Sequence, residues 1–295
     1  MIRCAALMLL GFWAGAATPA VAQPNVVIVN LDDFGWGDIG AYGSDYTETP
    51  NLDALAAAGM RFTQFYSGAP ICSPSRAALF TGQFSARSGI NSFLNNSADN
   101  LARDNADSLS LSAPSMARAF HDGGYATGHF GKWHLGGGRD VGYATNPTPG
   151  TNVAAPRIVE YGYDEAWTQF EGLGNRIINV ADYGGDAQGV ATRPSAYYNG
   201  LNQQSDARGT GGGLDEIVYL ERQYNATFMV DRAIEFLDQS KAADPNKPVF
   251  MNVWLDESHT PHDPPDHLQA KYDNLYPSLP AETRGYLAVI EYADL

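Results

Sequence analysis

The chain has 295 residues, of which 33 are acidic and 18 are basic, so its formal net charge is −15. Nucleic-acid binding depends on clustered Lys and Arg side chains, and this acidic balance therefore argues against a nucleic-acid partner. An anionic substrate would also be repelled at long range, so a site for one requires a local concentration of cations.

Residues 1–22 have the pattern of an export signal. Arg3 is followed by an apolar stretch, residues 5–17, and by the small-residue exit Ala20-Val21-Ala22. The apolar stretch is too short to span a membrane. We therefore expect a mature chain that starts near Gln23, is exported to the periplasm or the outside of the cell, and has no membrane span.

The first predicted strand is residues 25–31, a run rich in β-branched side chains that is typical of a strand buried on both faces of a parallel sheet. Asp32 and Asp33 follow at its carboxyl end, where open α/β sheets place ligand sites. Adjacent carboxylates repel each other unless a cation or hydrogen-bond donors compensate, and hard divalent cations prefer oxygen ligands. The pair indicates either a metal site or a solvated turn before Gly35.

A short helix over residues 53–58 and a strand over residues 61–66 are predicted next. They lead into Cys72, the one cysteine outside the signal segment. Exported proteins generally pair their thiols or omit them, so this cysteine is either a small buried hydrophobe or a reactive group.

The residues after Cys72 favour the reactive interpretation. Pro74 suits the first turn of a helix, and Thr81-Gly82 ends it. Cys72 then lies at a helix N-terminus, where free N–H groups and the helix dipole favour an anion. Arg76 follows about one turn later, so its guanidinium can reach the same point.

Residues 114–123 are predicted as a helix that leads into a strand over residues 125–130. Lys132 and His134 lie two positions apart, so in extended chain both side chains point to one side and could address one anion. Isolated Lys and His side chains are more often solvent-exposed and without a role.

Residues 136–213 are rich in glycine, asparagine and aromatic residues and have weak periodicity, which indicates a long loop that is either functional or disordered. Aromatic side chains here could stack on a sugar or aryl ring, or could simply pack at the surface; they are Tyr143, Trp167, Tyr197 and Tyr198.

An amphipathic helix over residues 224–239 precedes a buried strand over residues 248–255. The proline-rich segment after this strand carries His259 and His262, which we expect on a loop at the strand's carboxyl end. Two histidines beside acidic residues could instead form a zinc site, although no cysteine lies nearby.

Taken together, Cys72-Ser73-Pro74-Ser75-Arg76 with Thr81-Gly82, and the segment 124–134, resemble the two signatures of the type I sulfatase family of the alkaline phosphatase-like superfamily. The resemblance covers nearly the whole mature chain. Phe130 departs from it, because the family usually has a small or aliphatic residue there, and this affects packing rather than chemistry.

The resemblance implies that a maturation enzyme converts Cys72 to formylglycine, whose hydrate is the nucleophile. It implies that Asp32, Asp33 and the modified Cys72 bind one divalent metal, with calcium favoured and magnesium the alternative. The catalytic residues it implies are Cys72, Arg76, Lys132, His134 and His262. The substrate contacts it implies are Lys132, His134, His259 and His262, with His262 matching the family's active-site histidine better than His259.

Alternating helices and strands predict an α/β fold, a mostly parallel sheet with helices on both faces. The family completes its metal site with an Asp-Asn pair and adds a lysine, both downstream of a helix that resembles residues 286–295. We therefore expect residues 23–295 to be a sulfatase catalytic domain that lacks its C-terminal part.

Hydrolysis of aryl or carbohydrate sulfate esters is the favoured function. A phosphonate or phosphate ester hydrolase of the same superfamily is the first alternative, because tetrahedral oxyanions are similar. An inactive glycan-binding protein that keeps the pocket is the second.

Overall fold

The computed structural model describes residues 23–95, 97–136, 155–156, 158–169 and 222–295. Its centre is a four-stranded sheet in the order β1-β4-β2-β3, in which every neighbouring pair is parallel. The strands are β1 (Val26–Leu31), β2 (Ala126–Lys132), β3 (Glu165–Gln169) and β4 (Val249–Leu255). The predicted parallel α/β fold is confirmed.

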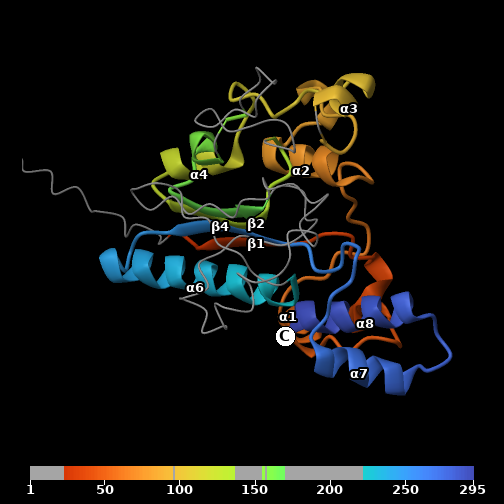
Figure 1. The fold of residues 1–295 in the computed structure, drawn as a ribbon. Coiled ribbons are helices and arrows are strands. Elements are labelled where there is room, and N and C mark those ends of the chain that lie inside the picture. The colour runs from red at the N-terminus through yellow and green to blue at the C-terminus, as the bar shows by residue number, and fades with distance from the viewer. Residues whose placement is uncertain (1–22, 96, 137–154, 157, 170–221) are drawn as a thin grey trace, which may run out of the picture.

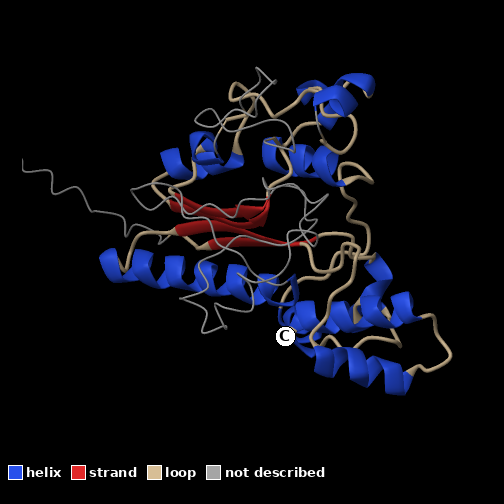
Figure 2. Ribbon diagram, in the orientation of Figure 1, coloured by secondary structure: helices blue, strands red, loops and turns tan. Residues whose placement is uncertain are grey.

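Helices cover both faces of the sheet (Figures 1 and 2). On one face lie α2 (Cys72–Thr81) and α4 (Met116–Asp122), and on the other lies α6 (Asn225–Ala243). A separate group is formed by α1 (Pro50–Ala58), α7 (Asp266–Leu275) and α8 (Ala281–Asp294), and α3 (Ser97–Ala102) lies beyond α2. Short 3-10 helices span Trp36–Asp38, Gly40–Tyr42, Ser85–Ser88, Ile158–Tyr161 and Arg222–Tyr224.

The strand β4 supplies both hydrophobic cores because its side chains alternate between the two faces of the sheet. Phe250 and Trp254 enter the core beneath α2 and α4, whereas Met251 and Val253 enter the core beneath α6. Every residue of β4 and β2 is buried. A strand with this environment is mostly apolar, as β4 is, and its one polar side chain, Asn252, is buried and donates to the hydroxyl of Tyr163.

Two strand predictions differ from the structure. β1 is an edge strand, and Val27 and Val29 are 47% and 57% exposed, so it is buried on one face and not on both. Residues 61–66 form no strand. They pair with no strand of the described sheet, and Phe62, Phe65 and Tyr66 are exposed, so β-propensity alone does not make them extended.

The carboxyl ends of β1, β4 and β2 lie side by side, because Leu31 pairs with Leu255 and Gly131 pairs with Trp254. The segments that follow these strands carry Asp32, His259 and His134, and Lys132 is the last residue of β2. The topology thus assembles residues that are about 100 or more positions apart in the sequence at one edge of the sheet.

Gly131 has no room for a side chain beside β4. Its φ is +115°, and a Cβ added there would lie 2.0 Å from the carbonyl oxygen of Trp254. We expect Gly131→Ala to lower the free energy of unfolding by about 2–6 kcal/mol, because a strained φ and an overpacked contact add. Urea unfolding would measure this.

Gly43→Ala is the matched control, since Gly43 has a similar φ of +104° but open space around the added Cβ. Its cost should be the strain alone, about 1–3 kcal/mol. Equal losses at the two positions would contradict the close approach of the strands.

Candidate active site

A buried ionic cluster lies at the carboxyl edge of the sheet. Asp32, directly after β1, forms two ion pairs. Its Oδ1 lies 2.8 Å from Arg76 Nη2, and its Oδ2 pairs with Lys132 Nζ. Arg76 also donates from Nη1 to the carbonyl of Lys132, at 2.8 Å. All three side chains are at most 7% exposed.

The cluster keeps Asp32 ionised and retains positive charge. Burial by itself would raise the pKa of Asp32, but the charges of Arg76 and Lys132 and their hydrogen bonds outweigh it and hold the pKa well below its usual range. One carboxylate therefore faces two cations, so the buried set carries a net positive charge. A buried charge that is not fully compensated favours a counter-ion, here an anion.

Cys72 is the first residue of α2 and is half-buried. Burial raises the pKa of its thiol above the usual range. The charges of Lys132, Asp32 and Arg76 have smaller effects, since the two cations lower the pKa and the carboxylate raises it. The structure therefore brings Cys72 within electrostatic reach of the cluster. With a raised pKa the thiol is protonated at neutral pH, and a protonated thiol is a poor nucleophile.

His134 is buried on the same edge and is neutral. The pKa of His134 is lowered to about 3, mainly by burial and to a smaller extent by the charge of Lys132. Its Nε2 lies 2.9 Å from the carbonyl of Leu94, which can only accept, so Nε2 carries the proton and Nδ1 is an acceptor. Nδ1 is buried and has no partner among the described residues. Leu94 in turn donates its N–H to the hydroxyl of Ser73, next to Cys72.

Asp33 and His259 extend the cluster toward solvent. His259 Nε2 lies 3.7 Å from Asp33 Oδ2, and the two side chains are 21% and 56% exposed. Ligand atoms of Asp32, Asp33 and His259 all lie within 4.8 Å of one another. These side chains fit a divalent cation, because the two carboxylates offer the oxygen ligands of a hard ion and the imidazole offers a nitrogen ligand of the kind that zinc prefers.

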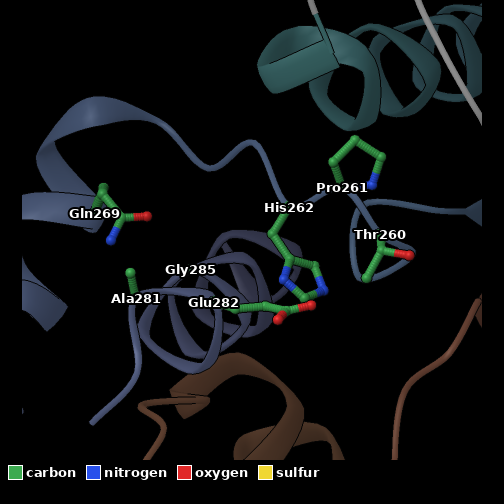
Figure 3. Close-up of a pocket in the computed structure, with 7 residues that line it drawn as sticks. All are labelled: Thr260, Pro261, His262, Gln269, Ala281, Glu282 and Gly285. Atoms are coloured by element: carbon green, nitrogen blue, oxygen red, sulfur yellow. The ribbon is translucent and has the colours of Figure 1, made fainter.

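The structure places the two histidines in different surroundings. His262, the preferred candidate from the sequence, is not part of the group formed by Asp32, Asp33 and His259. It lines a separate pocket of about 370 Å³ whose other lining residues are Thr260, Pro261, Gln269, Ala281, Glu282 and Gly285. In Figure 3 its ring faces the carboxylate of Glu282, and it packs against Tyr286 with ring centroids 5.3 Å apart. The loop bends between Thr260 and His262, and this bend separates the side chains of two histidines that are three positions apart.

The aromatic residues considered for a substrate cleft are not supported as a group. Trp167 lies on β3, packs edge-on against Phe228 at 5.5 Å and donates to Glu165, so it is a packing residue. Tyr143, Tyr197 and Tyr198 lie outside the described residues.

Two contacts of the site were not predicted. Ser258 donates its hydroxyl to the carbonyl of Asp32, and Tyr286 donates to the carbonyl of Asp33 at 3.2 Å. Each joins residues more than 220 positions apart, for which no local pattern exists.

The fold and this site define a parallel α/β protein with a cluster of buried cations and a group of metal-ligand side chains at the carboxyl edge of its sheet. The family model described as Sulfatase matches residues 24–295, and the chain therefore belongs to the sulfatase family. It is 44% identical to dog (Canis lupus familiaris) arylsulfatase G over 114 residues, which are 39% of this chain and 20% of the relative. It is 45% identical to human (Homo sapiens) arylsulfatase A over 124 residues, 42% and 23% of the two chains.

The solved structure of Ps i-CgsB in complex with k-i-k-neocarrahexaose superposes with a TM-score of 0.66 at 24% identity. The match covers 92% of this chain and 52% of the other, and it shows the fold. The chain thus spans about half of this neighbour, and the matched segments span about a fifth of the arylsulfatases.

No helix within the described part of the chain is both long and apolar enough to cross a bilayer.

Removing the Asp32 carboxylate should destabilise the protein strongly. Asp32→Asn leaves Arg76 and Lys132 buried without their shared partner, a change that typically costs about 3–5 kcal/mol. Asp273→Asn is the control, because Asp273 pairs with Arg284 at the surface and is far more exposed. Urea unfolding in a metal chelator should show a large loss for the first variant and a small one for the second.

The same carboxylate predicts a pH dependence of stability. The pKa of Asp32 is lower in the folded state than its ordinary value of 3.8, so its contribution is complete above that value. It is lost as the pH falls toward the depressed pKa, because the unfolded state takes up the proton first. Asp32→Asn should flatten the stability profile below about pH 4, and an unchanged slope would contradict the pairing.

The two histidines can be separated by matched substitutions. His259→Ala removes the ring beside Asp33 and should lower kcat/KM for a sulfate ester by about 10²–10⁴-fold, the range typical of a proton-transfer or site-contact group. His262→Ala removes a ring of the neighbouring pocket and should lower kcat/KM less than about tenfold, which is a smaller effect than the loss of a proton-transfer or site-contact group. Steady-state kinetics would check this, and a larger loss for His262→Ala would restore the order expected from the sequence.

Proposed function

We propose that this protein hydrolyses sulfate esters, aryl or carbohydrate, at the site formed by Asp32, Cys72, Arg76 and Lys132. The observation that carries the proposal is that two buried cations share one carboxylate beside the cysteine that opens α2. This arrangement binds an oxyanion locally in a molecule whose net charge is −15. Membership of the sulfatase family supports the same assignment.

Lys132 and Arg76 are the proposed sulfate contacts. An ammonium has three N–H donors and a guanidinium has five, and the contacts with Asp32 and with the carbonyl of Lys132 use only some of them. Arg76 Nε, for example, is buried and has no partner among the described residues. Donors fixed in a buried site stabilise the charge on the equatorial oxygens of a reacting sulfate group.

Asp32 and Asp33 are the proposed metal ligands, with calcium favoured over magnesium. Formylglycine at position 72 would supply the hydroxyl nucleophile as its hydrate, and the divalent ion would polarise the sulfate group. The raised pKa of the unmodified thiol supports a requirement for this conversion. A formylglycine-generating maturation enzyme is therefore a proposed partner, and export by way of residues 1–22 is the proposed route.

The two histidines near the cluster have different proposed roles. His134 is neutral with an acceptor at Nδ1, so it suits accepting a hydrogen bond from a hydroxyl at position 72 and orienting that hydroxyl. It cannot protonate a leaving group, because its one proton is held by the carbonyl of Leu94. His259 is partly exposed beside Asp33 and is the proposed acid that protonates the departing alcohol.

Cys72→Ala should lower the rate of aryl sulfate hydrolysis by roughly 10⁴-fold or more, because it removes the nucleophile and leaves only binding. The assay uses protein produced together with the maturation enzyme. Mass spectrometry of the peptide that contains residue 72 should find an aldehyde in place of the thiol. A fully active protein with an intact thiol would contradict the proposal.

The control is Ser75→Ala, one turn away on α2, whose hydroxyl donates to the carbonyl of Cys72 and is not assigned a role. Parallel assays with an aryl phosphate diester and an aryl phosphonate test the first alternative, which faster turnover of either would favour. Binding of a sulfated glycan without any product release would favour the inactive glycan-binding alternative.

A further inference from the structure

The loop that follows β4 is held from both sides. It comprises Asp256, Glu257, Ser258 and His259, and the first three are buried. On the side of the active site, Ser258 donates to the carbonyl of Asp32, and the N–H of Asp32 donates to the carbonyl of Leu255 at 2.9 Å. The backbone of this loop is thereby joined to the turn that carries Asp32 and Asp33.

On the opposite side the loop is held by Arg222. This residue opens the short 3-10 helix before α6 and is 7% exposed. Its Nη2 donates to the carbonyl of Asp256 at 3.0 Å and also to the carbonyl of His259. One planar guanidinium thus joins the first and the last residue of the loop, a geometry that a lysine ammonium cannot reproduce as rigidly.

Neighbouring groups hold the acidic side chains of the same loop. Asn225, one turn later, donates to Asp256 Oδ1 at 3.1 Å and to Glu257 Oε1 at 3.3 Å. Glu257 is buried within electrostatic reach of the guanidinium. The buried cation therefore lies close to acidic residues of the loop it holds, and no hydrogen bond or ion pair joins it to Asp32 or Asp33 among the described residues.

The side chain of His259 has few constraints of its own. Its Nδ1 contacts the carbonyl of the next residue, Thr260, at 2.8 Å, and its Nε2 only approaches Asp33, at 3.7 Å. The direction of the ring therefore depends on the backbone that carries it, and Arg222 contacts that backbone directly.

We propose that Arg222 is a positioning residue of the active site, which aims His259 at the Asp33 carboxylate through its bond to the His259 carbonyl. The inference rests on the proposed function, in which His259 faces the substrate and the metal-binding carboxylates. It adds a residue about 37 positions before His259, in a different element.

Two binding measurements test the inference without turnover. Terbium luminescence reports the metal site, and calorimetric titration with inorganic sulfate in excess calcium reports the anion site. His259→Ala defines which of the two affinities depends on His259. Arg222→Ala should weaken the same affinity by about 10-fold or more, as outer contacts of a metal site typically do. Arg222→Lys should lose less, because it keeps the charge and can bond one carbonyl.

The double variant decides between positioning and general stabilisation. If Arg222 acts through His259, Arg222→Ala should cause no further loss in the His259→Ala background, because coupled residues are not additive. Arg232→Ala is the control on α6, since Arg232 pairs with Glu235 at 2.7 Å on the same helix. It should leave both affinities unchanged.

Additive losses of affinity in the double variant would overturn the inference. The inference would also be overturned if His259→Ala weakened binding while Arg222→Lys and Arg222→Ala left both affinities unchanged. If Arg222→Ala does not fold, the same comparison is made with Arg222→Lys, alone and combined with His259→Ala, and additive losses would again overturn the inference. An unsubstituted protein that binds neither probe would overturn the proposed function itself. A protein that binds both with no response to Arg222 would overturn only the role of this arginine.

Discussion

The contact on which the site depends is the one between Asp32 and its two buried cations. Arg76 comes from α2 and Lys132 from the end of β2, and neither could be buried at acceptable cost without a carboxylate between them. The same contact therefore ties α2 to the sheet and fixes the donors that face the anion. Because one negative charge serves two positive ones, stability and anion affinity arise from one arrangement and cannot be varied separately.

This local excess of positive charge makes the proposed anion site compatible with an acidic protein. Exposed acidic groups are screened by salt within about 10 Å, whereas buried charges are screened much less. At the site the nearest charges are Arg76 and Lys132, both with at most 2% exposure, and their field dominates over the distant surface. Net charge thus excludes extended basic interfaces but says little about a single buried site.

The sequence predicted well what depends on local pattern. β4 was recognisable because six of its seven residues are apolar. Cys72, Arg76 and Lys132 lie in short signatures whose spacing is fixed by a helix turn or a strand end. Position within the sheet was not predictable, since an edge strand such as β1 has the same composition as a central one. The sequence favoured His262 over His259, but local pattern separates them poorly because both are followed by a residue and then proline. The contacts of this loop join it to distant parts of the chain, because Arg222 donates to the carbonyl of His259 and Ser258 donates to the carbonyl of Asp32.

Backbone conformation at the site supports a preorganised edge. Asp33 and His134 both have positive φ, +55° and +52°, directly after β1 and β2. Aspartate and histidine tolerate the left-handed region better than most residues, yet it is less favourable there than the helical or extended region. Such conformations persist only where the surroundings fix them, and here those surroundings are buried strands and the ionic cluster. The resulting turns direct Asp33 outward to solvent and His134 inward to Leu94, so two residues at matching strand ends acquire opposite environments. One carboxylate is thereby left accessible to a cation, while one imidazole is kept neutral.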